Sequence, residues 1–213
     1  MFAPVPSLLL PSFVLLASLI AQEAAAAEPP VISPFGRAAA VRRDALPGYV
    51  EMSHGEIIPG HVYLTRDARL KLHDEKVQRQ REVPLRAVRQ IQCAVKKEWM
   101  ERQWRFKELT RAEKVYTGRS YPARQYVHTI TLHDGRTLSG GLSAVVYVRP
   151  CSHAPSESGK YNTPPQPRRC ILHKRDKGKI GEKLESLHYV KLIKLGEAAL
   201  AEGRKKAAAQ NSN

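Results

Sequence analysis

The feature that most constrains the fold is a succession of short apolar runs that occurs twice along the chain. Each occurrence begins with an alternating run, passes through a turn that contains glycine, and continues into further runs. The runs lie at 50–52 and 61–64 in the first occurrence, and at 129–132 and 137–148 in the second. Alternation over roughly 4–8 residues between turn formers is typical of strands. The pattern therefore predicts an all-β protein.

The two occurrences share their spacing. Gly55 and Gly60 are five residues apart, and so are Gly135 and Gly140. The closing apolar residues, spaced by three, are Leu85, Val88 and Ile91 in one case and Leu187, Val190 and Ile193 in the other. We also align Leu70–His73 with Cys170–His173, since each precedes a charged turn. These matches indicate two copies of one supersecondary unit.

About five short strands with glycines at tight bends resemble the SH3-like and Sm-like small barrels. The expected fold is two tandem SH3-like β-barrel repeats, with a loop insertion in the second. The predicted boundaries are a first repeat at 47–94, a connector at 95–121, a second repeat at 122–196 with its insertion at 150–169, and a disordered basic tail at 197–213.

The connector holds both tryptophans. Val95, Trp99, Arg102 and Phe106 follow a 4-3-4 spacing that suits one face of a helix, whereas Met100, Arg102, Trp104 and Phe106 alternate as in a strand. We favour a partly exposed helix and keep a hairpin as the alternative. The tryptophans either close the seam between the repeats or stack on a base or sugar ring.

The first 27 residues are typical of a signal peptide. An apolar stretch at 7–21 precedes small residues, and Ala25 and Ala27 favour cleavage before Glu28. The alternative is a retained anchor, but Pro11 interrupts the stretch, which is shorter than the ~20 residues that a bilayer requires. We expect an exported protein, periplasmic or secreted, with a flexible linker at 28–46 and no transmembrane segment in the mature chain.

The formal net charge is +15, and removal of a leader whose only charged side chain is Glu23 raises it to about +16. Such a charge favours anionic partners. A basic ridge is the candidate anion-binding site, composed of Arg168, Arg169, Lys174, Arg175, Lys177 and Lys179. A solvated hairpin tip is the alternative. Export makes an envelope polymer or an envelope protein a more plausible partner than nucleic acid.

Three cysteines are present, and in an oxidising compartment Cys151 and Cys170 could form a disulfide across the insertion. The same two residues with His153 and His173 could instead bind zinc or copper(I), but their spacing suits a metal poorly. Cys93 lies in an apolar setting and either stays reduced or pairs between chains. The sequence predicts the disulfide, and no metal or cofactor.

Catalytic motifs are absent from the sequence: no nucleophile elbow, phosphate-binding loop or zinc-protease pattern occurs. His128 or His133 with Asp134 could assist a hydrolysis, but Asp134-Gly135 is also a common hairpin turn. We expect a non-catalytic module that binds an anionic macromolecule or an envelope protein. The alternative is a metal-dependent or His-assisted hydrolase of the cell envelope.

Four phrases carry a resemblance to a family: 104–108, 114–122, 128–135 and 172–178. Together they resemble a family of exported proteins of planctomycete-type bacteria, over about residues 48–196. The resemblance implies an exported location. It implies no activity and no catalytic residues.

Overall fold

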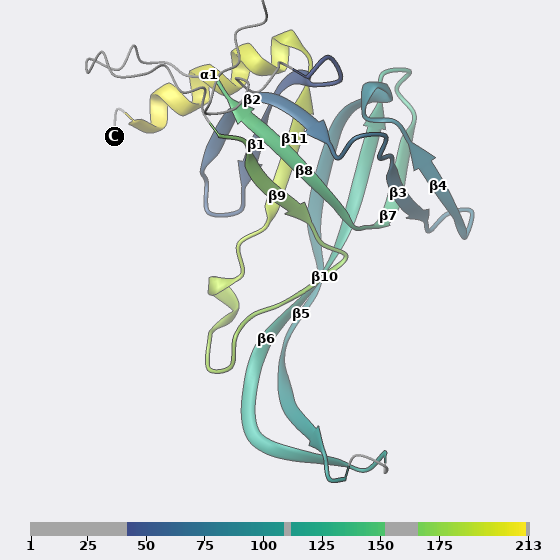
Figure 1. Cartoon of the computed structure of the whole chain (residues 1–213), viewed down its shortest axis with the longest axis vertical. Coiled ribbons are helices and arrows are strands. Elements are labelled where there is room, and N and C mark those ends of the chain that lie inside the picture. Colours follow the sequence, from purple (N-terminus) through teal and green to yellow (C-terminus); the bar gives the residue numbers. More distant parts are fainter. Residues whose placement is uncertain (1–41, 109–111, 152–165, 212–213) are drawn as a thin grey trace, which may run out of the picture. The chain divides into compact units, whose positions relative to one another are not determined.

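The computed structural model describes residues 42–108, 112–151 and 166–211. Their strands form one 11-stranded antiparallel sheet (Figure 1). The prediction of a mainly β protein is therefore confirmed. The predicted signal peptide and residues 28–41 of the predicted linker lie outside the described residues. Within the described part of the chain, no helix has the length and apolar composition that a membrane crossing requires.

The elements follow one another in two similar series. The first comprises β1 (Leu46–Met52), β2 (Ile57–Leu64), β3 (Leu70–Asp74), β4 (Arg79–Val83), a 3-10 turn η1 (Leu85–Ala87) and β5 (Val88–Phe106). The second comprises β6 (Lys114–Leu132), β7 (Thr137–Leu142), β8 (Ala144–Pro150), β9 (Arg168–Leu172), β10 (Arg175–Lys177), η2 (Leu184–Ser186), β11 (Val190–Leu195) and the helix α1 (Glu197–Asn211).

Strands of the two series alternate within the sheet. The order is β4-β3-β7-β6-β5-β11-β1-β2-β8-β9, and β10 pairs with β6. The residues of the expected repeats at 47–94 and 122–196 therefore contribute to one sheet and do not form two separate ones. The order is symmetric about its centre. Reading it from the opposite edge gives the same order once β1 is exchanged with β6, β2 with β7, β3 with β8, β4 with β9 and β5 with β11. We call positions related by this exchange equivalent.

The register follows the same relation. Ile91 pairs with Ile193 at the centre of the sheet, and each is the equivalent of the other. Gly60 and Gly140 are equivalent, and at each the neighbouring strand crosses closely. A Cβ atom would overlap the carbonyl oxygen of Arg149 at Gly60, and that of His73 at Gly140. Both crossings therefore require glycine, which gives the repeated glycine spacing a physical reason.

The alignment of Leu70–His73 with Cys170–His173 is wrong. Leu70 pairs with Val83 just as Val146 pairs with Cys170, so β3 is the equivalent of β8, and β9 that of β4. The error arises from the insertion, which lies between β8 and β9. The first series has only the short β3–β4 turn at this place, so the sequence pattern aligns the strand after the insertion with β3, although its equivalent is β4.

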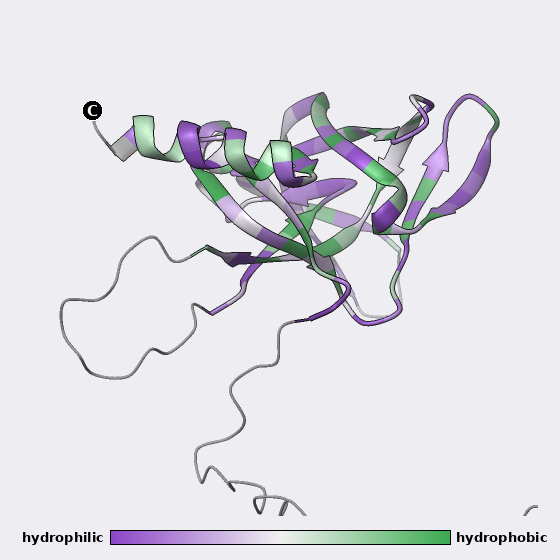
Figure 2. Cartoon of the chain, turned by 90° about the horizontal axis from the view of Figure 1, so that it is seen from above, coloured by the Kyte–Doolittle hydropathy of each residue, from purple (hydrophilic) through white to green (hydrophobic). Residues whose placement is uncertain are grey.

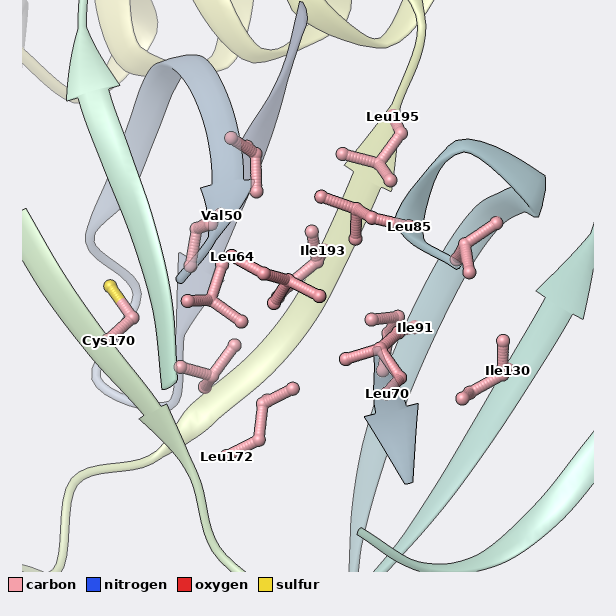
Figure 3. Close-up of a cluster of buried hydrophobic side chains, with 14 of the residues drawn as sticks. Val50, Leu64, Leu70, Leu85, Ile91, Ile130, Cys170, Leu172, Ile193 and Leu195 are labelled. Atoms are coloured by element: carbon pink, nitrogen blue, oxygen red, sulfur yellow. The ribbon is translucent and has the colours of Figure 1, made fainter. Parts of the chain in front are cut away.

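One apolar core joins the two series. Fully buried side chains come from the first series, such as Leu70 and Leu72, and from the second, such as Ile130 and Leu142. Figure 3 shows side chains of this cluster, among them Leu64, Leu70 and Ile193, gathered between strands of both series. Burial of each such side chain contributes about 1.5–3 kcal/mol, so the shared core is the main source of stability.

The predicted connector helix is wrong, and the hairpin alternative is correct. β5 and β6 continue out of the core as one ladder whose last pair is Phe106 with Lys114. Alternation along 100–106 therefore outweighs the helical spacing of the same residues. We call residues 95–106 and 114–125 the arm, which extends below the other strands in Figure 1.

The prediction of a disordered tail is also wrong for residues 197–211, because they form the helix α1. Ala199 and Leu200 are buried, and the helix packs on β1 and β2. A Cβ at Gly203 would lie 2.5 Å from the Cβ of Tyr49, so glycine lets the helix approach this ring. The Tyr49 hydroxyl donates a hydrogen bond to Glu202 at 2.9 Å. These contacts are long-range in sequence, which is why composition alone predicted disorder.

Candidate functional site

The arm concentrates the exposed apolar surface. Among the described residues, six of the eight large hydrophobic side chains that are exposed lie on it: Val95, Met100, Trp104, Phe106, Val115 and Tyr116. Most strands bury their apolar residues in the core, but the distal arm pairs only with itself. A contiguous exposed apolar surface on a soluble protein typically marks an interaction site.

One face at the end of the arm combines rings with cations. Trp104 lies directly opposite Tyr116, and Phe106 opposite Lys114, so these side chains share a face. The Arg102 guanidinium lies 4.6 Å from the centroid of the Tyr116 ring, and the Lys114 Nζ atom 4.2 Å from that of Trp104. The Trp104 and Phe106 rings meet edge to face at 5.0 Å.

We call these five residues the tip face: Arg102, Trp104, Phe106, Lys114 and Tyr116. Phe106 and Tyr116 are about half exposed, at 52% and 53%. The face contains no acidic residue, so its two cations are held by aromatic rings and remain available to an anion.

The opposite face of the arm holds two residues of the predicted ridge. Arg175 and Lys177 lie in β10, beside β6. The Arg175 guanidinium is 2.5 Å from a Glu101 carboxylate oxygen and 5.1 Å from the Trp99 centroid, and Lys177 is 3.9 Å from Glu101. Partial burial acts to raise the pKa of Glu101, but hydrogen bonds from Arg175 and Tyr121 bring it below its usual value. Glu101 therefore neutralises much of this pair.

The structure does not gather the six predicted ridge residues into one site. Arg168 and Arg169 lie in β9 at the edge of the sheet, where Arg168 forms an ion pair with Glu56. The Lys174 side chain lies against Gly141, and the Lys179 backbone N–H donates to Glu182. Only Arg175 and Lys177 flank the arm.

The register also separates the two cysteines of the predicted disulfide. Cys170 pairs with Val146, whereas Cys151 follows the end of β8, five residues further along. At ~3.3 Å per residue this is ~17 Å along the strands, and a disulfide requires Cα atoms within ~7 Å. His153, which the metal alternative needs, lies outside the described residues, and no metal-binding group of three His, Cys, Asp or Glu residues occurs within them.

The histidines of the hydrolase alternative do not share a site. His128 has no exposed surface, and neither ring nitrogen has a hydrogen-bond partner. Burial, with a smaller effect of His173, lowers the pKa of His128 to about 4, so the ring is neutral at pH 7. His133 lies in the exposed turn after β6, where its backbone N–H donates to Ala87. His128 is therefore an interior residue opposite Cys93 and not an accessible base.

Comparisons with protein-family models, characterised proteins and solved structures find no match. The candidate site therefore rests on the geometry of this chain. Sequence reasoning placed the anion site on the ridge and missed the tip face. The available signal was the alternation of Arg102, Trp104 and Phe106 followed by the strand-like run after Lys114, which together describe a hairpin with rings and cations on one side.

Proposed function

We propose that the protein is a non-catalytic module that binds an anionic macromolecule through the arm. The observation that carries the proposal is the tip face, where two cations and three exposed rings occur together without an acid. Aromatic rings and arginine are the side chains that most often dominate binding energies at interfaces.

Charge supports an anionic ligand over a neutral one. The chain carries a formal charge of +15, which attracts polyanions over long range and accelerates their association. The tip face then provides short-range contacts: Arg102 and Lys114 for anionic groups, and the open sides of the rings for apolar faces of the polymer.

The proposed location decides which polyanion is the better candidate. The sequence of residues 1–27 supports export, and so does the resemblance to exported proteins of planctomycete-type bacteria. An exported module meets anionic envelope polymers, such as acidic glycans, more often than nucleic acid. We therefore propose an acidic envelope polymer as the ligand.

We further propose that the two series of strands are copies of one SH3-like or Sm-like unit that have exchanged strands. The two halves of the sheet support this proposal. Each half places the last strand of a series, β11 or β5, beside the first of four neighbouring strands, in the orders β11-β1-β2-β8-β9 and β5-β6-β7-β3-β4. In this proposal each unit takes two strands from one copy and three from the other.

Retention on immobilised heparin, a sulfated glycan, tests the arm. We expect the double variant Arg102→Ala/Lys114→Ala to bind about tenfold more weakly at fixed salt, because two exposed contacts of about 0.7 kcal/mol each are lost. The variant Trp104→Leu/Tyr116→Leu keeps the charge but removes the rings that hold the cations, so it should elute earlier as well.

The control removes the same charge elsewhere. Lys71→Ala/Lys191→Ala deletes two cations that lie off the arm in ion pairs with Glu82 and Glu51, and should change retention little. Alanine at Lys174, Arg175, Lys177 and Lys179 should weaken retention less than the arm variant does, because Glu101 already neutralises two of the four. Equal losses in the arm variant and the control would refute the arm as the site.

A further inference from the structure

Two hollows lie at equivalent places in the two series. One, of about 370 Å³, lies beside the start of β2 and β9, and the other, of about 740 Å³, lies beside β4 and the start of β7. Four pairs of equivalent positions line them: Ile57 and Thr137, Ile58 and Leu138, Pro150 and Asp74, and Arg168 and Arg81.

The smaller hollow is bounded on one side by the helix α1. Helix α1 forms one wall of it through Arg204, Ala207 and Ala208. The charge of Arg168 in its lining is balanced by Glu56, and hydrogen bonds from Arg168 lower the pKa of that carboxyl. A helix with small side chains thus packs at the side of this hollow.

Among the residues that the structure describes, none from α1 lines the larger hollow. Arg136, which lines the larger hollow, is the equivalent of Glu56 but is itself engaged, since it pairs with Asp134 at 2.7 Å. Asp74 is already engaged by Arg81 at 3.1 Å. Within the described residues, neither the Lys76 ammonium nor the Arg79 guanidinium has an ion-pair partner.

The floor of the larger hollow is apolar, although its rim is mainly basic. Val83, Pro84, Leu132 and Leu138 line the floor, next to the exposed edge strand β4. The rim acid Glu82 is paired with Lys71 at 3.5 Å. In Figure 2 the β3–β4 hairpin, on the right as in Figure 1, carries mainly hydrophilic residues. The combination of an apolar floor, a cationic rim and an unpaired strand edge suits an extended or helical peptide rather than a small ion.

We propose that the larger hollow is a docking site for an acidic peptide segment of a partner protein. Apolar side chains of that segment would pack on Leu132 and Leu138, and its carboxylates would pair with Lys76 and Arg79. The equivalent hollow has the helix α1 along one wall, so a peptide segment already packs beside the equivalent surface. The basic rim selects acidic side chains. This site is independent of the arm, and either can fail without the other.

Selection from a display library of random 16-residue peptides on the full chain tests the proposal. We expect enriched peptides to combine acidic with apolar residues. Synthetic copies of these peptides should bind the variant Lys76→Gln/Arg79→Gln at least about tenfold more weakly. The single variant Arg136→Glu recreates the charge found at Glu56, and should also abolish binding. Thermal unfolding of each variant verifies that it is folded.

The arm variant Arg102→Ala/Lys114→Ala is the matched control, since it removes the same charge from the other site. The proposed docking site is supported if the peptides bind the arm variant as well as the unaltered chain but do not bind Arg136→Glu. The proposal is overturned if selection yields no acidic peptides, or if the peptides bind Arg136→Glu as well as the unaltered chain. Heparin retention tests the proposed function separately. It should be lost only in the arm variant, so failure of one proposal can be told from failure of the other.

Discussion

The two halves of the sheet share a strand order but differ in what is added to them. The half formed by β11, β1, β2, β8 and β9 is covered by α1, which packs on Tyr49. The half formed by β5, β6, β7, β3 and β4 has Thr129 at the position equivalent to Tyr49, partly exposed. This second half instead extends its central pair into the arm and leaves the larger hollow open.

The comparison separates stability from recognition. Positions that meet in the core, such as Ile91 and Ile193, are alike in the two halves because they satisfy the same packing. Positions at the surface differ, as Glu56 and Arg136 do. The helix that covers the first half stabilises it, whereas the second half leaves the rings and cations of the tip face exposed. Both proposed binding surfaces accordingly lie on the second half.

The largest effect is expected from adding a side chain at one of the two equivalent glycines where neighbouring strands cross closely. In Gly140→Ala the new Cβ would overlap the His73 carbonyl oxygen, which belongs to backbone and cannot rotate away. We expect a loss of about 3 kcal/mol in the free energy of unfolding, measured by denaturant titration. Gly60→Ala, at the equivalent crossing beside Arg149, should cost a similar amount.

Gly141→Ala is the control for this prediction. Its Cβ would meet only methylene groups of Lys174, at 3.0 Å, and that flexible side chain can move. Its effect should stay below about 1 kcal/mol. If Gly140→Ala were as mild as Gly141→Ala, the close crossing, and with it the equivalence of the two glycines, would be contradicted.

Acidification should destabilise the second half more than the first, because the second half buries a histidine where the first has glycine. His128 and Gly48 are equivalent, and only His128 titrates. Its pKa is about 4 in the folded chain and 6.5 in the unfolded reference, so the unfolded state binds the proton more readily. Stability is therefore fully present above pH 6.5 and declines as the pH falls toward 4, by about 3 kcal/mol in total.

Denaturant titrations at pH 7 and 4.5, on the unaltered chain and on His128→Leu, measure this loss. The leucine variant should lose about 2–3 kcal/mol less over the same interval. Amide hydrogen exchange should show β6 and β7 opening before β1 and β2 as the pH falls. Equal losses in both proteins would show that His128 is not the group responsible.

The sequence predicted the common features of the halves better than their differences. The glycine spacing and the triplets ending at Ile91 and Ile193 follow from local constraints that every strand crossing and core position must obey. The exchange of strands could not be predicted, because β2 pairs with β8 through contacts across about 90 residues. Alternation does not specify which strand is the neighbour.

The site was harder to predict than the fold for a related reason. Arg168 and Arg175 are close in sequence, but β9 and β10 take them to different neighbours. Their charges are moreover balanced by Glu56 and Glu101, which lie far away in the sequence. A basic run reports formal charge, whereas binding depends on which cations remain unpaired after folding. Within the described residues, Arg102 and Lys114 have no ion-pair partner and lie over aromatic rings instead.

The smallest expected effect concerns the helix that only the first half possesses. Glu202 accepts a hydrogen bond from Tyr49 and pairs with Lys194 and Lys206 at 3.1 and 3.0 Å. Hydrogen bonds from Lys206, then Lys194 and Tyr49, lower its pKa to about 2. Its contribution is therefore present above pH 4.5 and is lost as the pH falls toward 2. The carboxylate is 37% exposed, so solvent screens much of this stabilisation.

We expect Glu202→Gln to cost about 1 kcal/mol or less in the free energy of unfolding at pH 7, and the cost should shrink in 1 M salt. Hydrogen exchange of α1 amides should accelerate while the amides of β6 and β7 keep their rates, because the hydrogen bonds and ion pairs of this carboxylate are made with Tyr49, Lys194 and Lys206. If β6 and β7 also accelerated, the helix would stabilise the whole sheet. The division between a closed half and a recognition half would then have to be abandoned.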